Sequence, residues 1–190
     1  MHHIHHTHAF VISHKDLGEA NRLYTIFTKE LGMVIATAQG VRKMSSKLRF
    51  TLQGGTYVKI DFVRGKEMWR ITSAQPIESL ETKDTSRIIV WNRILGLLAR
   101  LTQGEESHPQ VFSHIFNFFE NIKNINEEDL ANFEIICFIK LLFSFGYWEI
   151  IEGDELIVTS SYNKEIFDLI NKKRVVLVSR INNSLNASQL

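Results

Sequence analysis

Hydrophobic and polar residues alternate with a period of two between residues 8 and 76, and glycines interrupt the alternation. A period of two indicates β-strands that have one buried and one exposed face. The alternation is clearest over residues 57–63, where Val58, Ile60 and Phe62 would share one face. The pattern predicts five strands, over residues 9–13, 21–28, 33–38, 57–63 and 68–73.

Glycine-containing turns separate these segments. They fall at residues 16–18, 31–32, 54–55 and 64–66, and the last is short enough for a tight hairpin. Five short antiparallel strands within about 70 residues favour an OB-fold barrel, a fold that commonly binds nucleic acid on one exposed face. An SH3-like barrel would have the same period, so the pattern alone leaves both open.

After Pro76 the spacing of apolar residues changes to three and four, as in helices that pack on a core. It predicts helices over about residues 88–101, 111–122 and 127–145, with Asn126 as the cap of the third. Residues 163–170 and 175–185 are expected to form two more helices, and the segment 155–159 is too short to assign. The expected fold is α+β, with an N-terminal five-stranded antiparallel OB-fold barrel and a C-terminal all-helical domain.

The charge changes at the same place as the period. Residues 1–75 contain 11 Lys and Arg against 5 Asp and Glu, and the remaining residues contain 11 bases and 16 acids. The two parts therefore carry +6 and −5, although the whole chain carries only +1. These changes predict an OB-fold nucleic-acid-binding domain over residues 1–76 and a helical domain for DNA and protein contacts over residues 77–190.

Composition and motifs disfavour several other classes of protein. Cys137 is the single cysteine, so a disulfide framework and a cysteine-based zinc site are excluded, and a reducing, cytoplasmic setting is the simplest. The apolar stretch 133–151 is interrupted by Lys140 and Glu149, whereas a membrane span needs about 20 predominantly apolar residues. Because the N-terminus lacks the pattern of a secretory signal, no export is expected. No P-loop, H-E-x-x-H motif or nucleophile elbow occurs, so we expect no enzyme, no catalytic residue and no cofactor.

Histidines are concentrated at the N-terminus. Imidazoles bind metals, and alternate residues of an extended strand share a face. We expect these residues to form a mobile terminus without the fixed supporting contacts of a metal site, so no physiological metal is predicted. The histidines are His2, His3, His5, His6 and His8.

Basic residues cluster among the strands and turns of the predicted barrel. Lys and Arg side chains neutralise phosphates without reading sequence, and aromatic faces stack on bases, so the cluster indicates a nucleic-acid binder. The candidate DNA-binding residues are Arg22, Arg42, Lys43, Lys47, Arg49, Arg64, Lys66 and Arg70. The candidates for base stacking are Tyr24, Phe50, Tyr57 and Trp69, although large aromatic side chains more often fill the core of a small barrel.

The basic segment also carries a family resemblance. It runs Gly18-Glu19-Ala20-x-Arg22-Leu23-x-Thr25-x-Phe27-Thr28-x-Glu30-x-Gly32, then Ala38-x-Gly40-Val41-Arg42-Lys43 and Ser46-Lys47-Leu48-Arg49. This pattern resembles the N-terminal domain of the bacterial RecO recombination mediators, densely over residues 9–72 and more weakly beyond. The resemblance implies an OB barrel followed by helices, and binding of single- and double-stranded DNA. It also implies annealing of complementary strands and, with RecR, loading of RecA onto DNA coated with single-strand-binding protein.

Some residues depart from the family pattern. Many RecO proteins carry a four-cysteine zinc module in the helical domain, and this sequence, with Cys137 alone, cannot form one. Asn21 stands where an acid is usual, and Phe50 and Thr51 follow Arg49 where a small residue is more typical. The resemblance also implies an apolar pocket in the helical domain for the acidic C-terminal tail of single-strand-binding protein. The candidates for a base at its rim are Arg93, Arg100 and Lys140.

Two alternatives to the mediator function stay open. The barrel could be an adaptor that binds RecR or another protein, or an RNA-binding OB protein without annealing activity, because a basic barrel does not distinguish the sugar. The expected location is the bacterial cytoplasm, in association with the nucleoid and without a membrane partner.

Overall fold

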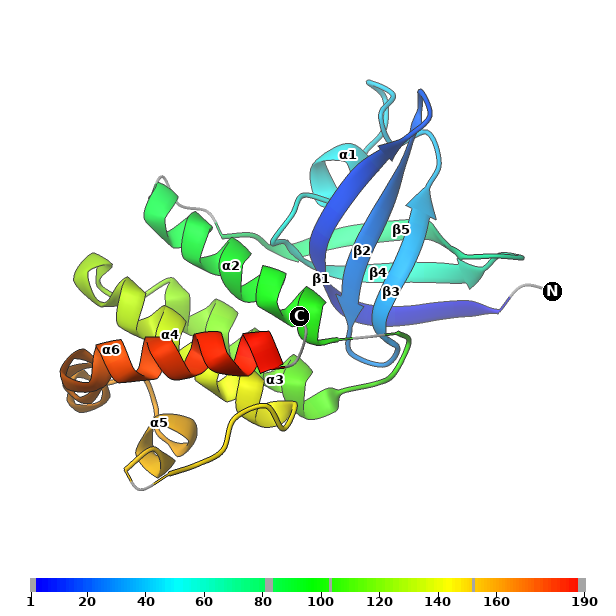
Figure 1. The fold of residues 1–190 in the computed structure, drawn as a ribbon. Helices are drawn as coiled ribbons and strands as arrows, with labels where there is room; N and C mark the ends of the chain where they lie inside the picture. Colours follow the sequence, from blue (N-terminus) through cyan, green and yellow to red (C-terminus); the bar gives the residue numbers. More distant parts are fainter. Residues whose placement is uncertain (1–2, 81–83, 103, 152, 188–190) are drawn as a thin grey trace. The chain divides into compact units, whose positions relative to one another are not determined.

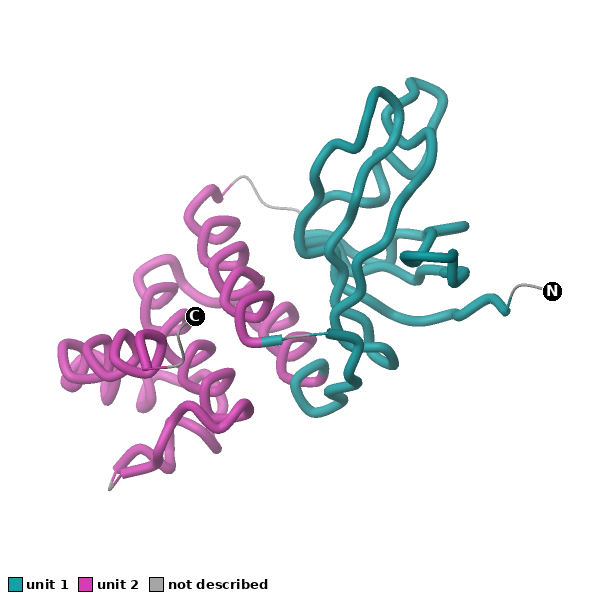
Figure 2. Tube along the Cα trace, turned by 45° about the vertical axis from the view of Figure 1, so that its right-hand side comes forward, with its two compact units in different colours: residues 1–81, 102–112 teal, residues 82–101, 113–190 magenta. Residues whose placement is uncertain are grey.

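The structure is a computed structural model, and it describes residues 3–80, 84–102, 104–151 and 153–187. The chain divides into two compact units (Figure 2). The first, which we call the barrel unit, contains residues 1–81 and 102–112. The second, the helical unit, contains residues 82–101 and 113–190. Each unit therefore consists of two segments of the chain, whereas the sequence pattern suggested a single boundary at residue 76.

The barrel unit contains, in the described residues, a closed five-stranded barrel in the order β1-β2-β3-β5-β4 (Figure 1). The strands are β1 (Ile4–Leu17), β2 (Asn21–Thr28), β3 (Gly32–Ala38), β4 (Tyr57–Arg64) and β5 (Trp69–Glu78). The prediction of an N-terminal OB-type barrel followed by helices is confirmed.

One seam of the barrel corrects the prediction that all strands are antiparallel. Strands β3 and β5 pair in parallel, through Ala36 with Trp69 and Thr37 with Arg70, while the other neighbouring strands are antiparallel. No hairpin joins β3 to β5, because α1 (Leu48–Thr51) and β4 lie between them in the chain. The intervening chain therefore allows the parallel direction, which a tight hairpin would forbid.

The alternating residues fill the interior of the barrel. Val58, Ile60 and Phe62 of β4 are completely buried, as their spacing predicted. They belong to a core cluster to which every strand contributes, and in which Val41 and Leu52 come from outside the strands. These two residues anchor the segment between β3 and β4 to the core.

Strand β1 begins earlier than predicted. It starts at Ile4 instead of residue 9, and His5, His6 and His8 pair in register with Phe62, Asp61 and Lys59 of β4. The expectation of a mobile terminus is therefore wrong for the residues from Ile4 onward. The segment is polar but extended, and the edge of β4 that faces away from β5 provides a partner for its backbone N–H and C=O groups.

Residues 104–112 pack on the barrel within the same unit. The ring of Phe112 lies 5.8 Å from the rings of both Phe10 and Phe27, measured between centroids. Gly32 has a φ of +71°, and a Cβ atom there would lie 1.9 Å from the backbone oxygen of Glu106. Only glycine fits this position, because both the backbone conformation and the neighbouring chain exclude a side chain.

Helices account for most of the helical unit. The described helices beyond β5 are α2 (Thr85–Leu101), α3 (Pro109–Ile122), the 3-10 turn η1 (Glu127–Asp129), α4 (Leu130–Ser144), α5 (Glu155–Thr159) and α6 (Lys164–Ala187). Helix α4 is buried along most of its length, as expected for its apolar sequence. None of the described helices is both long and apolar enough to cross a membrane.

Two helix boundaries differ from the prediction. The segments 163–170 and 175–185 form one continuous helix, α6, because the polar residues between them contain neither Gly nor Pro to interrupt the backbone hydrogen bonds. The predicted third helix begins with the turn η1, and the side chain of Asn126 makes no capping hydrogen bond there. The segment 155–159, which the pattern left unassigned, is the short helix α5.

Candidate nucleic-acid interface

The connection from β3 to β4 contains the densest group of the candidate basic residues. We call residues 39–53, which include α1, the β3–β4 connection. Asn21 Oδ1 accepts a hydrogen bond of 2.9 Å from the backbone N–H of Gly40, and Arg42 N donates to the oxygen of Ala20 at 3.0 Å. Gly40 has a φ of +66°, so the turn favours glycine. These hydrogen bonds hold the connection to the β1–β2 turn of the barrel, and the side chain of Asn21 stabilises the turn at Gly40.

Three of the candidate bases lie on the outer side of this connection. Lys43 and Lys47 are exposed, and Arg49 is half-buried. The side chain of Arg49 donates from Nη1 to Sδ of Met44 at 3.4 Å, and its guanidinium lies 5.8 Å from the ring centroid of Phe50. The structure thus places three positive charges within seven residues beside an exposed aromatic ring, an arrangement suited to a phosphate backbone with unpaired bases.

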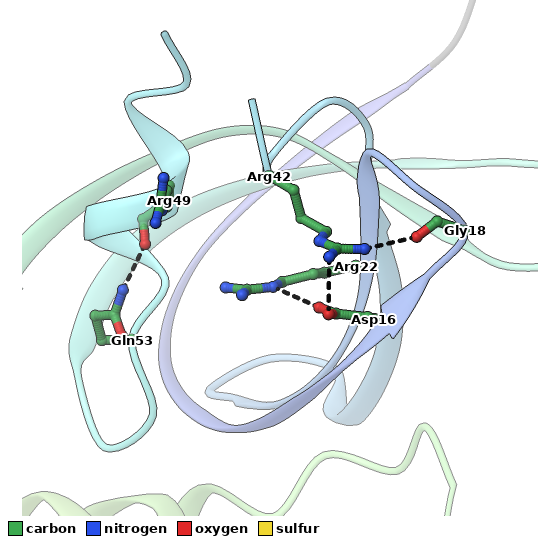
Figure 3. Close-up of polar contacts among 6 residues, drawn as sticks. All are labelled: Asp16, Gly18, Arg22, Arg42, Arg49 and Gln53. Atoms are coloured by element: carbon green, nitrogen blue, oxygen red, sulfur yellow. Dashed lines mark hydrogen bonds and ion pairs between the residues drawn. The ribbon is translucent and has the colours of Figure 1, made fainter. Parts of the chain in front are cut away.

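Arg22 and Arg42 are held by an acid instead (Figure 3). Arg22 Nε donates to Asp16 Oδ1 at 2.9 Å, and Arg42 Nη2 lies 3.4 Å from Asp16 Oδ2. Arg42 Nη1 also donates to the backbone oxygen of Gly18 at 2.8 Å. The hydrogen bond from Arg22 holds the pKa of Asp16 below its ordinary value, so this carboxylate is ionised and offsets part of the arginine charge.

The β4–β5 hairpin carries the remaining candidates, Arg64, Lys66 and Arg70. Arg64 Nη1 donates to both carboxylate oxygens of Glu105, at 2.7 and 2.6 Å, and its guanidinium lies 4.9 Å from the ring centroid of Trp69. Lys66 and Arg70 are exposed. The structure therefore separates the predicted set into an open group on the β3–β4 connection, a pair held by Asp16, and this hairpin group.

The strand register adds a base that sequence reasoning did not select. Arg70 pairs with Thr37, Thr37 with Leu23, and Leu23 with Lys15, so these residues form one row across β5, β3, β2 and β1. Lys15 is exposed like Arg70. With about 4.8 Å between neighbouring strands, the two positions lie about 14 Å apart on the barrel surface. The signal for Lys15 is the register, which a sequence pattern does not contain.

The four candidate stacking residues have different surroundings. Tyr24 is completely buried and Trp69 is 5% exposed, so their faces pack in the barrel core and the prediction that they stack on bases is corrected. Tyr57 is half-buried, with the ring of Phe10 at 4.9 Å and that of His8 at 5.8 Å. Phe50 is 74% exposed and is the candidate whose ring is most open to a ligand.

The N-terminal histidines contact acidic and aromatic side chains. His6 Nδ1 lies 2.7 Å from Asp61 Oδ1, and the ring of His5 meets that of Trp69 edge-on at 5.0 Å. Within the described ranges, no three His, Cys, Asp or Glu side chains converge in a way that could hold a metal ion.

The residues of the barrel match a known protein family. Residues 1–80 match the family model described as the recombination protein O N-terminal domain. The chain belongs to the RecO family. A DNA repair protein RecO of Desulfitobacterium hafniense is 29% identical over 146 residues, which are 76% of this chain and 52% of that protein.

Two other RecO relatives give the extent of the similarity. The DNA repair protein RecO of Dehalococcoides mccartyi is 30% identical over 145 residues, 74% of this chain and 56% of that protein. That of Heliobacterium modesticaldum is 41% identical over 71 residues, 37% of this chain and 26% of that protein. The chain thus spans about half the length of the RecO proteins from Desulfitobacterium and Dehalococcoides.

The helical unit of this RecO-family chain contains an apolar pocket between α4 and α6. Its volume is about 200 Å³, and Arg174 and Glu134 stand among its lining residues. Burial raises the pKa of Glu134, and Arg93 Nη1 lies 3.4 Å from its carboxylate. The apolar lining consists of Ala131, Ile135, Phe138, Val178 and Ile181.

The predicted rim bases occupy different places. Lys140 is 8% exposed, and its Nζ donates to the backbone oxygen of Ser160 at 2.8 Å, so it is a structural residue of the interior. Arg93 reaches the pocket only through Glu134, and Arg100 is exposed near the end of α2. Sequence reasoning missed Arg174, because its position opposite α4 follows from the packing of α6.

Proposed function

We propose that this chain acts in DNA repair and recombination as a mediator that binds single- and double-stranded DNA. The observation that carries the proposal is the group of Lys43, Lys47 and Arg49 beside Phe50 on the anchored β3–β4 connection. Positive side chains on a small barrel release counterions from phosphates and bind without regard to sequence. Membership of the RecO family supports the same role.

Annealing requires no covalent chemistry and no cofactor in this proposal. The basic surface holds one strand and lowers the electrostatic repulsion of a second strand that approaches it. Base pairing then supplies the free energy, so ATP is not needed. The duplex leaves when its geometry no longer fits the surface that held the single strand.

The proposal includes protein partners in the cytoplasm, at the nucleoid. RecR would act together with the barrel unit, and RecA would be loaded onto the DNA that is cleared. The pocket between α4 and α6 is the proposed site for the acidic C-terminal tail of single-strand-binding protein. Its apolar lining suits a hydrophobic terminal residue, and Arg174 suits a terminal carboxylate.

The decisive experiment measures annealing of two complementary oligonucleotides coated with cognate single-strand-binding protein. We expect the chain to accelerate annealing, and the acceleration to vanish when the coat protein lacks its acidic tail. An Arg174→Ala variant should lose the acceleration on coated strands while it keeps that on bare strands. Acceleration that is unaffected by tail removal would contradict the proposed role of the pocket.

The two alternatives give different results in binding measurements. An RNA-binding protein would prefer an RNA strand to the DNA strand of the same sequence, with a salt dependence of similar slope. An adaptor would bind RecR but show no salt-dependent binding to either strand. Equal or stronger binding to DNA, with annealing, would support the mediator.

A further inference from the structure

Met44 and Phe50 are conspicuous exposed hydrophobic side chains on the β3–β4 connection. Met44 is 87% exposed and Phe50 is 74% exposed. Both leave apolar surface in water only a few residues apart, whereas Val41 and Leu52 of the same segment are completely buried. Large apolar side chains that are exposed together are typical of interaction and ligand-binding surfaces.

Arg49 joins these two side chains into one surface. Its Nη1 donates to the sulfur of Met44 at 3.4 Å, and its guanidinium lies 5.8 Å from the ring centroid of Phe50. A polarizable thioether, a planar guanidinium and a phenyl ring all stack favourably on flat aromatic ligands. We call Met44, Arg49 and Phe50 the platform.

Hydrogen bonds and packing against the barrel core hold the segment of the platform in place. Leu52 N donates to the oxygen of Leu48 at 3.0 Å, and Leu48 packs against the barrel core. Gln53 Nε2 donates to the backbone oxygen of Arg49. A surface that is already ordered loses little conformational entropy when it binds.

The charge around the platform indicates its occupant. Exposed Lys43 and Lys47 belong to the same short segment as the platform, so a ligand that covers this segment would combine flat apolar faces with negative charges. Unpaired nucleobases on a phosphodiester chain have this combination, whereas a duplex hides the faces of its bases in the stack. An acidic peptide or an anionic lipid surface would supply charge but no row of flat rings.

We propose that Met44, Arg49 and Phe50 form a base-stacking platform that makes this chain bind single strands more tightly than duplexes. The inference rests on the proposed DNA-binding function, and it assigns to the platform the discrimination between the two forms of DNA. Lys43 and Lys47 then act on phosphates in both forms, and the aromatic ring acts only on unpaired bases.

The test compares a thymidine oligonucleotide, an abasic oligonucleotide of the same length and a hairpin duplex. We expect the full chain to bind the thymidine strand more tightly than the abasic strand. Phe50→Ala should weaken binding of the thymidine strand about tenfold, within the range measured for loss of one base stack, and should leave the abasic strand and the duplex nearly unchanged. Phe50→Trp should restore the preference.

A matched control is Val175→Ala, because Val175 of α6 is 84% exposed and carries no proposed role. It should leave all three affinities unchanged. Equal losses on all three ligands in Phe50→Ala, or no preference for thymidine over abasic DNA in the unaltered chain, would overturn the platform. If Phe50→Ala loses binding to anionic vesicles but binds the thymidine strand as tightly as the unaltered chain does, the surface would be assigned to a membrane instead. Absence of DNA binding by the unaltered chain would refute the proposed function itself, which is a separate outcome.

Discussion

The barrel unit and the helical unit each contain a cation close to an aromatic ring, and the two pairs have opposite surroundings. Arg49 lies 5.8 Å from the ring centroid of Phe50, and Lys140 lies 4.9 Å from that of Tyr162. Phe50 is 74% exposed, whereas Lys140 is only 8% exposed. The same chemistry can therefore serve a ligand in one unit and hold the fold together in the other.

The two pairs differ in the groups that compensate the positive charge of Lys140 and of Arg49. Burial lowers the pKa of Lys140, and its ammonium group is compensated by the oxygen of Ser160 and by the ring of Tyr162. Arg49 is bound to a methionine sulfur and a ring, both of which leave its positive charge free to attract an anion. In this chain, the pair whose ring is exposed is the candidate binding surface, and the pair whose cation is buried serves the fold.

The largest effect is expected from removing the cation of the buried pair. Lys140→Ala should lower the free energy of unfolding by about 2–4 kcal/mol, because it leaves a cavity at a buried side chain and removes the donor to the half-buried carbonyl of Ser160. Arg49→Ala, next to the exposed ring of Phe50, should change the free energy of unfolding by no more than about 0.5 kcal/mol. Urea unfolding followed by far-ultraviolet circular dichroism measures both. Equal destabilisation by the two variants would contradict the contrast between the pairs.

A second prediction concerns the exposed lysines. The double change Lys43→Ala and Lys47→Ala should weaken binding to single-stranded DNA of every sequence and lower the slope of log affinity against log salt by about 0.7 for each lysine. Fluorescence anisotropy over a range of salt concentrations measures the slope. The matched control is Lys164→Ala with Lys172→Ala, which removes two exposed lysines of α6. The same loss of slope in the control would mean that total charge matters rather than the barrel surface.

A smaller effect is expected at the paired arginines. Asp16→Asn removes the charge that holds Arg22 and Arg42, so DNA affinity should rise about threefold, in keeping with the small energies of exposed ion pairs. The salt dependence should become steeper because more positive charge faces the phosphates. Glu128→Gln, which removes an exposed acid of the helical unit, is the control. A decrease in affinity would show that Asp16 positions the arginines for binding.

The smallest expected effect is a pH dependence in the helical unit. Burial, with the positive charge of Lys140, lowers the pKa of His114. The unfolded chain therefore takes up this proton at a higher pH than the folded chain, and stability falls as the pH drops below about 6.5. His114→Gln should reduce the decrease of the melting temperature between about pH 7 and about pH 5. An unchanged decrease would mean that other groups account for it.

The sequence predicted the strands well where their alternation was strong. Strand β2 has the predicted bounds, and β3 and β4 each differ from them by one residue. The prediction was wrong for the start of β1, because the pairing of a polar segment with a free strand edge depends on a partner more than 50 residues away in the chain. The same limit applies to α6, where the polar stretch 171–174 resembled a boundary.

Candidate site residues could be selected by type but not by surroundings. Phe50 and Tyr24 are both aromatic residues within two positions of an arginine in the sequence, yet the first is 74% exposed and the second is completely buried. The alternation that predicts a strand assigns each residue to one of two faces, and it does not say which face closes into the barrel at the ends of the strands. Tyr24 and Trp69 were misassigned for this reason.

The sequence by itself determined the family, the barrel-then-helices order and the concentration of bases near the N-terminus. These properties follow from residue types and short periods, which act locally along the chain. Only the tertiary structure decided which bases are open to a ligand. Arg42 meets Asp16 through the register of β1 and the turn after β3, and Arg64 meets Glu105 from 41 residues further along the chain. The charge on each base is local, but its partner is set by folding, and the partner decides whether that charge is free to bind DNA.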